Sequence, residues 1–218
     1  MLNDGNESYG IIGLSEHWLL PYESDELAIA NYRVSAHFSR AKGYGGSMLL
    51  TRNNIDFQKV ADIDKLSVEK VCEVSAISVP SLNVVVVSVY RSPSSDFQLF
   101  LCTFCDIVNQ IRSKDVNVVI GGDFNVAFSP LDKNGSDLCN IMLSFGLYST
   151  VTFPTRHKRC IDNVFTNLDL DIYDVTPFIS CMSDHTGIVF TLKNITRANN
   201  QLHNKNIRLV QPISNKGK

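Results

Sequence analysis

Two nearly continuous runs of β-branched residues flank a helical pattern in the middle of the chain, and this arrangement constrains the fold most. Residues 83–90 read NVVVVSVY and residues 116–121 read VNVVIG, so both runs predict strands that are buried on both faces. Between them the apolar residues follow the spacing of one helix face, and Ser95 with Gln98 matches a capping box. We therefore expect a helix over residues 96–112 and a strand–helix–strand crossover.

The rest of the chain predicts many strands and few helices. Strands are expected over residues 11–15, 32–38, 48–51, 71–79, 160–166, 172–178 and 186–192. A second, shorter helix is expected over residues 138–145, with Gly146 at its end. Apolar strands with short helices between them indicate an α/β fold whose sheets are covered on both sides. Asparagine, glutamine, lysine and arginine dominate after Lys193, so we expect a domain over residues 1–193 and a polar linker or tail over 194–218.

Composition excludes several classes of protein. The chain has 218 residues, 44% of them hydrophobic, and a net charge of −2, which indicates a single sizeable core and no polycation. Any nucleic-acid partner must therefore meet a local basic patch. The six cysteines include one Cys-x-x-Cys, formed by Cys102 and Cys105, without a second pair at zinc spacing. Such scattered cysteines fit a reducing compartment, and no apolar run approaches the ~20 residues of a membrane span.

Polar residues of a particular kind recur where the apolar strands begin or end. They are Glu16 after IIGLS, Tyr90 and Arg91 after NVVVVSV, Asp123 and Asn125 after VNVVIGG, Asp162 in CIDNVFTN, and Asp184 and His185 before TGIVFTL. Because ligand sites gather at one end of a sheet, we expect these side chains to converge.

The mixture of side chains at these positions favours phosphoryl chemistry. Carboxylate oxygens suit Mg²⁺, histidine transfers protons or stabilises charge, and asparagine, tyrosine and arginine donate to phosphate oxygens. Together they predict metal-assisted attack on a phosphoryl centre. Each residue also has an ordinary interpretation, such as a turn-forming aspartate or a strand aromatic. Trp18 fits packing, and the basic residues 156–159 fit either a solvated loop or contacts to a phosphate backbone.

Five segments in order, LSEHWL, VYRSP, IGGDFNV, FPTRHKRCIDNVFTN and MSDHTGIVF, resemble the endonuclease/exonuclease/phosphatase family. More narrowly, they are similar to the apurinic-like endonuclease domain of non-LTR retrotransposons, over residues 9–193. The resemblance implies a four-layer α/β sandwich of two mixed β-sheets flanked by helices.

The resemblance also implies a role for each matching residue. Glu16 would be the Mg²⁺ ligand and Tyr90 would contact the phosphate. Asp123 would orient or deprotonate the attacking water, and Asn125 would bind the scissile phosphate and steady the transition state.

Three further residues complete the site that the resemblance implies. Asp162 would pair with His185, and His185 would contact the phosphate and stabilise developing charge. Asp184 would be a ligand of a second metal or a neighbour of the first metal site.

The implied activity is a Mg²⁺-dependent (or Mn²⁺-dependent) DNA endonuclease that nicks target DNA and leaves a 3′-hydroxyl. DNA would be the partner, without a membrane or a small-molecule cofactor, and the location would be intracellular, in the nucleus if the target is chromosomal DNA. Two alternatives stay open: a catalytically dead remnant that binds DNA or a partner, and a phosphatase of the same family acting on a small phosphorylated substrate.

The start and the end of the chain depart from the family pattern. Family members begin with a strand carrying an asparagine near the metal, and nothing before Glu16 supplies it, because Asn3 and Asn6 lie in a polar opening. We therefore expect an N-terminally truncated domain that lacks the usual first strand, with an edge or gap in one sheet and reduced stability and activity. The resemblance also leads us to expect a reverse transcriptase after the endonuclease domain, and the polar residues 194–218 do not resemble one.

Overall fold

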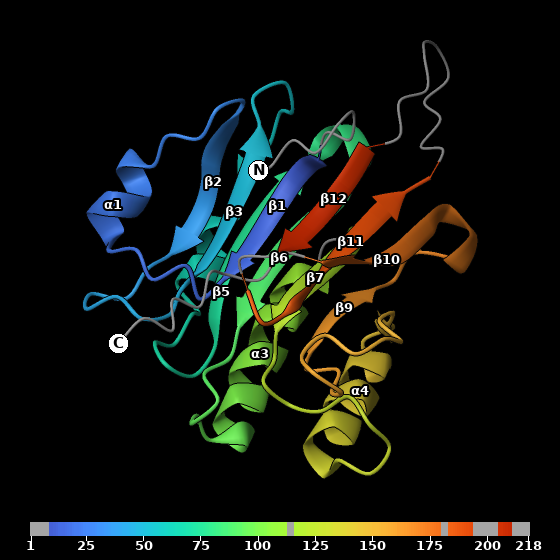
Figure 1. Ribbon diagram of the computed structural model, residues 1–218. Helices are drawn as coiled ribbons and strands as arrows, with labels where there is room; N and C mark the ends of the chain where they lie inside the picture. The colour runs from blue at the N-terminus through green and yellow to red at the C-terminus, as the bar shows by residue number, and fades with distance from the viewer. Residues whose placement is uncertain (1–8, 113–115, 180–182, 194–204, 211–218) are drawn as a thin grey trace.

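Two six-stranded mixed sheets pack face to face in the computed structural model, which describes residues 9–112, 116–179, 183–193 and 205–210 (Figure 1). The first sheet has the strand order β10-β11-β12-β1-β3-β2. Its strands are β1 (Tyr9–Ser15), β2 (Tyr32–Phe38), β3 (Ser47–Arg52), β10 (Tyr173–Ile179), β11 (Thr186–Leu192) and β12 (Lys205–Val210). Only β1 and β12 pair in parallel, and the other described pairs in this sheet are antiparallel.

The second sheet contains the predicted crossover. Its strands, in the order β4-β5-β6-β7-β9-β8, are β4 (Gln58–Lys59), β5 (Glu73–Val79), β6 (Val84–Tyr90), β7 (Asn117–Asp123), β9 (Asp162–Thr166) and β8 (Tyr148–Ser149). Strands β6 and β7 are parallel neighbours joined through helix α3 (Phe97–Arg112), as the sequence predicts.

The remaining helices are short. They are α1 (Pro21–Glu26), α2 (Ala61–Asp64) and α4 (Lys133–Ser144), with 3₁₀ turns at Pro80–Leu82 and Leu170–Ile172. Helix α4 begins earlier than predicted because the Asp132 side chain caps it, accepting a bond from Gly135 N at 2.9 Å. Gly146 follows this helix with φ 70°, as expected for a helix end. Across the described residues, no helix has the length and apolar character needed to cross a membrane.

Three apolar clusters hold the layers together. Between the sheets, Ile11, Leu49, Val86, Val119 and Phe190 share one buried cluster. Helices α3 and α4 cover the outer face of the second sheet (Figure 1). Aromatic rings lie in this contact, including Phe100, Phe104, Phe124 and Phe165. On the outer face of the first sheet, Tyr9, Ile12, Tyr32, Met48 and Leu50 are covered from the α1 side by Leu19 and Leu27. The predicted α/β sandwich is confirmed, with a thin outer layer over the first sheet.

The contact between the sheets becomes polar towards one end. The Ser47 hydroxyl donates to the Ser88 carbonyl at 2.7 Å and lies 3.0 Å from the Ser75 hydroxyl. The Ser15 hydroxyl donates to the Val89 carbonyl at 3.1 Å. Strands β1 and β6 both end here, so these bonds fix one sheet on the other where the polar strand-end residues lie.

The segment after Lys193 differs from the sequence expectation. Residues 194–218 predict a linker or tail, whereas Lys205–Val210 forms β12, parallel to β1 and antiparallel to β11. As a result β1 has a neighbour on both edges, β12 and β3, where the sequence predicts an edge or gap. Backbone pairing with two strand edges stabilises this short segment, whose alternation is surrounded by polar residues in the sequence. Asn3 and Asn6 lie outside the described residues.

Candidate active site

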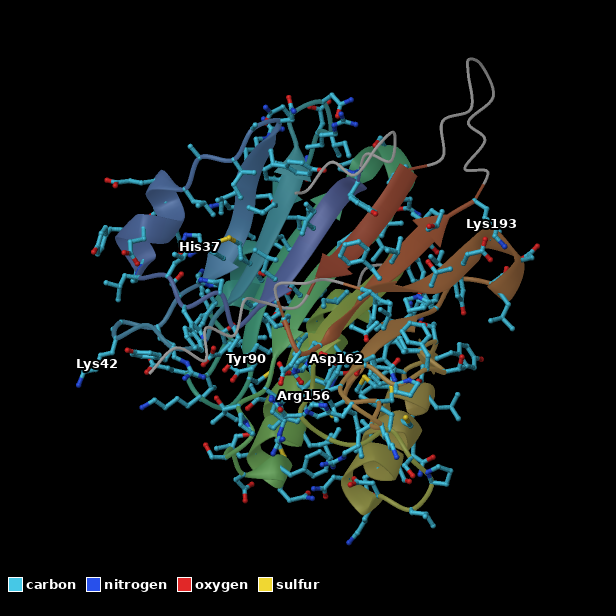
Figure 2. The ribbon with its side chains drawn as sticks, in the orientation of Figure 1. His37, Lys42, Tyr90, Arg156, Asp162 and Lys193 are labelled. Carbon is cyan, nitrogen blue, oxygen red and sulfur yellow. The ribbon has the colours of Figure 1, made fainter. Side chains whose placement is uncertain are left out.

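A row of polar residues crosses the second sheet at the end where β6 and β7 stop. In the backbone register Glu73 is opposite Tyr90, Tyr90 is opposite Asp123, and Asp123 is opposite Asp162. Directly paired residues of adjacent strands point to the same face of a sheet. The register alone therefore brings three of the predicted site residues side by side. Figure 2 shows Tyr90 and Asp162 near each other at this end of the sandwich.

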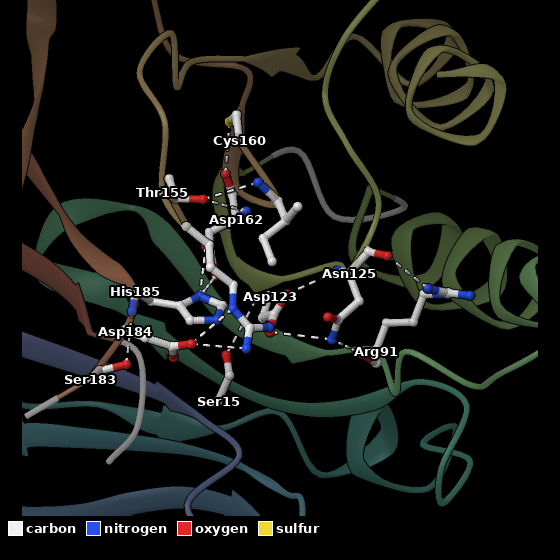
Figure 3. Close-up of polar contacts among 12 residues, drawn as sticks. Ser15, Arg91, Asp123, Asn125, Thr155, Cys160, Asp162, Ser183, Asp184 and His185 are labelled. Atoms are coloured by element: carbon white, nitrogen blue, oxygen red, sulfur yellow. Dashed lines mark hydrogen bonds and ion pairs between the residues drawn. The ribbon is translucent and has the colours of Figure 1, made fainter. Parts of the chain in front are cut away.

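Asp123 is the last residue of β7 and is buried. Its carboxylate accepts a bond from Asn125 N at 2.9 Å and one from Asn125 Nδ2 at 3.2 Å. Asn125 has φ 49°, a left-handed conformation that asparagine tolerates, and its Nδ2 also donates to the Arg91 carbonyl at 2.7 Å. The turn after β7 thus directs the carboxamide back onto the carboxylate (Figure 3).

Asp162 and His185 form a buried pair between the two sheets. His185 Nδ1 lies 2.9 Å and 3.2 Å from the two carboxylate oxygens of Asp162. Thr155 supports the pair, because its hydroxyl accepts bonds from the backbone N–H groups of Ile161 and Asp162, each at 3.0 Å. Among the described residues no partner reaches His185 Nε2, so this nitrogen is left for a ligand.

Glu16 reaches the site from the end of β1 in the first sheet. The Tyr90 hydroxyl donates to Glu16 Oε1 at 2.7 Å, so the two sheets contribute one residue each to this bond. Burial, followed by the neighbouring Glu16 charge, raises the pKa of Tyr90 well above its ordinary value. Tyr90 therefore keeps its proton and acts as a donor at neutral pH.

Asp123 has the most perturbed carboxyl group of the site. Burial raises its pKa well above the ordinary value, and the nearby Asp162 charge raises it further. Two carboxylates this close cannot both stay charged without a proton or a cation beside them.

Asp184 is turned towards Arg156 of the basic turn. Its carboxylate accepts bonds from Arg156 Nη2 at 2.9 Å and from Nε at 3.1 Å (Figure 3). Burial tends to raise the pKa of Asp184, but the Arg156 hydrogen bond and charge outweigh it and the pKa is lowered. In the described residues Asp184 is thus held by a cation of the protein itself.

One cluster has the spacing of a metal site. Ligand atoms of Asp123, Asp162 and His185 lie within 4.8 Å of one another, and all three residues are buried. Two carboxylates offer the oxygen ligands that Mg²⁺ or Mn²⁺ prefers, and the raised pKa of Asp123 marks negative charge that a cation would offset. The residues present fit a divalent cation.

The structure gives two arginines supporting contacts that differ from the donation to phosphate that the sequence suggests. Arg91 is buried, and its guanidinium donates to the carbonyls of Ser95 at 2.8 Å and of Phe124 at 3.4 Å, so it braces the site from behind. Arg156 reads as part of a solvated basic loop, yet it pairs with Asp184. Long-range contacts of this kind have no local sequence pattern, so only the fold reveals them.

The face-to-face mixed sheets and the buried acidic cluster define a class of α/β sandwich proteins that includes nucleases and phosphatases. A model of the Endonuclease/Exonuclease/phosphatase family matches residues 4–185, and the chain belongs to this family. The family resemblance predicted from the motifs is confirmed. Comparison with curated proteins found no match.

Solved structures with this fold include three of note. The endonuclease domain of TRAS1, a telomere-specific non-LTR retrotransposon, is 20% identical over 86% of this chain and 87% of its own, with a TM-score of 0.65. The 3′ phosphatase NExo from Neisseria, bound to a product DNA hairpin, is 18% identical over 82% and 87%, with a TM-score of 0.59. The catalytic domain of Xenopus laevis APE2 is 14% identical over 95% and 86%, with a TM-score of 0.56. At these identities the likeness establishes the fold.

Proposed function

We propose that this chain is a Mg²⁺-dependent DNA endonuclease that hydrolyses one phosphodiester bond and leaves 3′-hydroxyl and 5′-phosphate ends. The observation that carries the proposal is the buried acidic cluster of Asp123 and Asp162 with His185, beside the Tyr90–Glu16 bond. These groups match the needs of phosphoryl transfer, which are a cation, a positioned water and donors to the phosphate oxygens.

The cation would be held by carboxylate oxygens of Glu16 and of the acidic cluster. When bound, Mg²⁺ or Mn²⁺ supplies positive charge beside the phosphate oxygens. Oε1 of Glu16 accepts the hydrogen bond from Tyr90, and no described residue donates a hydrogen bond to Oε2, which is the oxygen open to a cation. Asp184 stays a candidate ligand of a second cation, which would have to replace its two bonds from Arg156.

The protein's own groups would prepare the attack and stabilise its product. Asp123 has a raised pKa, so its carboxylate accepts a proton from an attacking water more readily than an exposed aspartate does. Asn125 Nδ2 donates to the Arg91 carbonyl and, over 3.2 Å, to Asp123, so it would hold a phosphate oxygen by exchanging the longer bond to Asp123 for one to the phosphate. Asp162 orients the His185 ring through Nδ1, so that in the imidazolium form of the ring Nε2 would donate to the developing negative charge.

Exposed basic side chains beside the site favour a nucleic acid over a small substrate. Residues 156–159 form a tight turn, with Arg159 N donating to the Arg156 carbonyl at 2.9 Å. Lys158 and Arg159 are exposed and, with Phe128 and Phe153, line a cavity of about 460 Å³. Cations of this kind contact backbone phosphates. The matching location is intracellular, in the nucleus if the protein acts on chromosomal DNA.

The proposal is tested by incubating purified protein with supercoiled plasmid in Mg²⁺, in Mn²⁺ and in EDTA. Nicked circles should form only with metal, and a DNA polymerase should extend the nicks because their ends are 3′-hydroxyls. Nicking that persists in EDTA would contradict the proposal. Metal-dependent phosphate release from small phosphomonoesters without nicking would favour the phosphatase alternative, and DNA binding without any cleavage would favour the catalytically dead alternative.

A further inference from the structure

The segment that carries Glu16 has an unusual backbone that a neighbouring turn holds in place. Glu16 and Trp18 have φ values of 60° and 64°, in the left-handed region that non-glycine residues rarely adopt. Glu16 N donates to the Gly46 carbonyl at 2.7 Å, and Trp18 N donates to the Gly45 carbonyl at 3.0 Å. The position of Glu16 therefore depends on the glycine turn over residues 43–46.

A buried ion pair holds this turn in its shape. Arg40 Nε lies 2.5 Å from Glu73 Oε1, and the side chains are 9% and 0% exposed. Glu73 Oε2 accepts a bond from Gly46 N at 2.6 Å, and Arg40 donates to the Tyr44 carbonyl. The ion pair thus forms hydrogen bonds to the residues on either side of Gly45, Tyr44 and Gly46. Gly45 is the residue whose carbonyl accepts the bond from Trp18 N.

The same ion pair supports the other contact of Glu16. Glu73 is opposite Tyr90 in the sheet, and the Arg40 guanidinium lies 5.6 Å from the centre of the Tyr90 ring. Tyr90 in turn donates to Glu16 at 2.7 Å. Both the backbone and the carboxylate of Glu16 are therefore supported from the Arg40–Glu73 pair.

The shape of the turn is matched to this pair. A Cβ atom at Gly45 would lie 2.3 Å from the Arg40 guanidinium, and one at Gly46 would lie 2.3 Å from the His17 ring. A buried ion pair by itself contributes little to stability, and apolar residues of similar volume hold a core equally well. Apolar residues cannot accept the Gly46 N–H, however, whereas the Glu73 carboxylate accepts it together with the Arg40 guanidinium, so the pair has a use beyond packing.

We infer that the Arg40–Glu73 pair is a positioning device that fixes Glu16 for metal binding. This inference rests on the proposed function, in which Glu16 is a metal ligand. Neither residue touches the acidic cluster, and both act through the turn and through Tyr90. Partners that orient metal ligands in this way typically change metal affinity about tenfold to a hundredfold when they are replaced.

The test uses a variant in which the pair is replaced without leaving a buried charge. Arg40→Met combined with Glu73→Leu keeps the volume of the pair and removes the bonds to the turn. Thr166→Val is the matched control, because it removes a buried bond to the Val118 carbonyl (2.6 Å) at the opposite end of the sheet. Circular dichroism melts establish that each variant is folded.

Two readouts follow the segment and the metal separately. Trp18 is the only tryptophan, so acrylamide quenching of its fluorescence measures how well the Glu16 segment is held in metal-free protein. A Mn²⁺ titration followed by the EPR signal of the free ion measures metal affinity, with Glu16→Gln to establish that the binding depends on Glu16. In the double variant quenching should increase and Mn²⁺ affinity should fall about tenfold or more. In Thr166→Val both should stay at wild-type values.

The outcomes separate this inference from the proposed function. A folded double variant with wild-type quenching, or with wild-type Mn²⁺ affinity, would overturn the inference even if the wild type nicks DNA. If the wild type binds no Mn²⁺ through Glu16, the proposed function fails, and the quenching data alone decide whether the pair positions the segment.

Discussion

At the scale of single residues, Asp123 and Asp162 stand opposite each other on adjacent strands, both nearly inaccessible to solvent. Like charges in this arrangement oppose folding unless a proton or a cation lies between them. The site therefore has a stability cost built into it, which cation binding would relieve.

Replacing Asp123 should stabilise the metal-free protein. The pKa of Asp123 is higher in the folded than in the unfolded protein, where it is about 3.9. Its ionisation therefore lowers the free energy of unfolding progressively as the pH rises from the unfolded pKa through the folded pKa. Asp123→Asn removes this effect and should raise the free energy of unfolding by about 1–2 kcal/mol at neutral pH. Thermal melts in EDTA at several pH values measure it, and the gain should shrink towards pH 4. If the wild type were more stable than Asp123→Asn at pH 7, the carboxylate would not oppose folding and the prediction would be wrong.

A second residue-scale prediction concerns the glycine that precedes Asp123. A Cβ atom at Gly122 would lie 1.9 Å from the Val89 carbonyl oxygen, so Gly122→Ala must move the β6–β7 backbone. We expect a loss of about 3 kcal/mol in urea unfolding. Gly146→Ala is the control, since no atom lies within 4 Å of the added carbon and only its φ of 70° opposes the change, which should cost about 1 kcal/mol. Equal losses in the two variants would rule out steric crowding at Gly122.

At the scale of elements, the sequence predicts those that have a strong period of their own. The continuous apolar run of β6 and the helical spacing of α3 predict the bounds of these elements to within about one residue of those observed. The period-two alternation of residues 71–79 predicts a strand with only one buried face, but nearly every residue of β5 is buried because the sheet is covered on both faces. Strand β12 reads KNIRLV, a short alternation that the polar residues before it outweigh in a sequence window, and its place in the sheet comes from its two neighbours.

The contribution of β12 can be measured by deletion. Removing residues 194–218 leaves β1 and β11 with unpaired edges, so we expect a loss of at least about 3 kcal/mol and a tendency to aggregate. Chemical unfolding and light scattering report the two effects. Removing residues 211–218 alone keeps β12 and serves as the control. Identical stability of the longer deletion and the full chain would show that β12 does not contribute to the sheet in solution.

At the scale of the whole molecule, the site is assembled from both sheets. Glu16 follows β1 and His185 precedes β11 in the first sheet, while Tyr90, Asp123 and Asp162 end or begin strands of the second. The sequence could predict that these residues gather at strand ends, because each one borders an apolar run. It could not predict the pairs that hold them, such as Arg40 with Glu73, because those contacts depend on how the sheets and loops meet.

A site shared between two sheets should couple metal binding to global stability. Mg²⁺ at about 100 times its dissociation constant should stabilise the wild type by about 2.7 kcal/mol, since it binds only the folded state. Differential scanning fluorimetry with and without Mg²⁺ measures this shift, and it should be lost in Glu16→Gln. A shift that the variant retains would place the cation elsewhere.

The most direct test of the account is the single-turnover rate of plasmid nicking in Mg²⁺ for the wild type, Asp123→Asn and His185→Ala. Asp106→Asn, which changes an exposed carboxylate on α3, is the matched control. We expect the two site variants to lose at least about a hundredfold in rate, because each removes a proton-transfer or charge-stabilising group, while the control keeps the wild-type rate. Wild-type rates in both site variants would contradict the account.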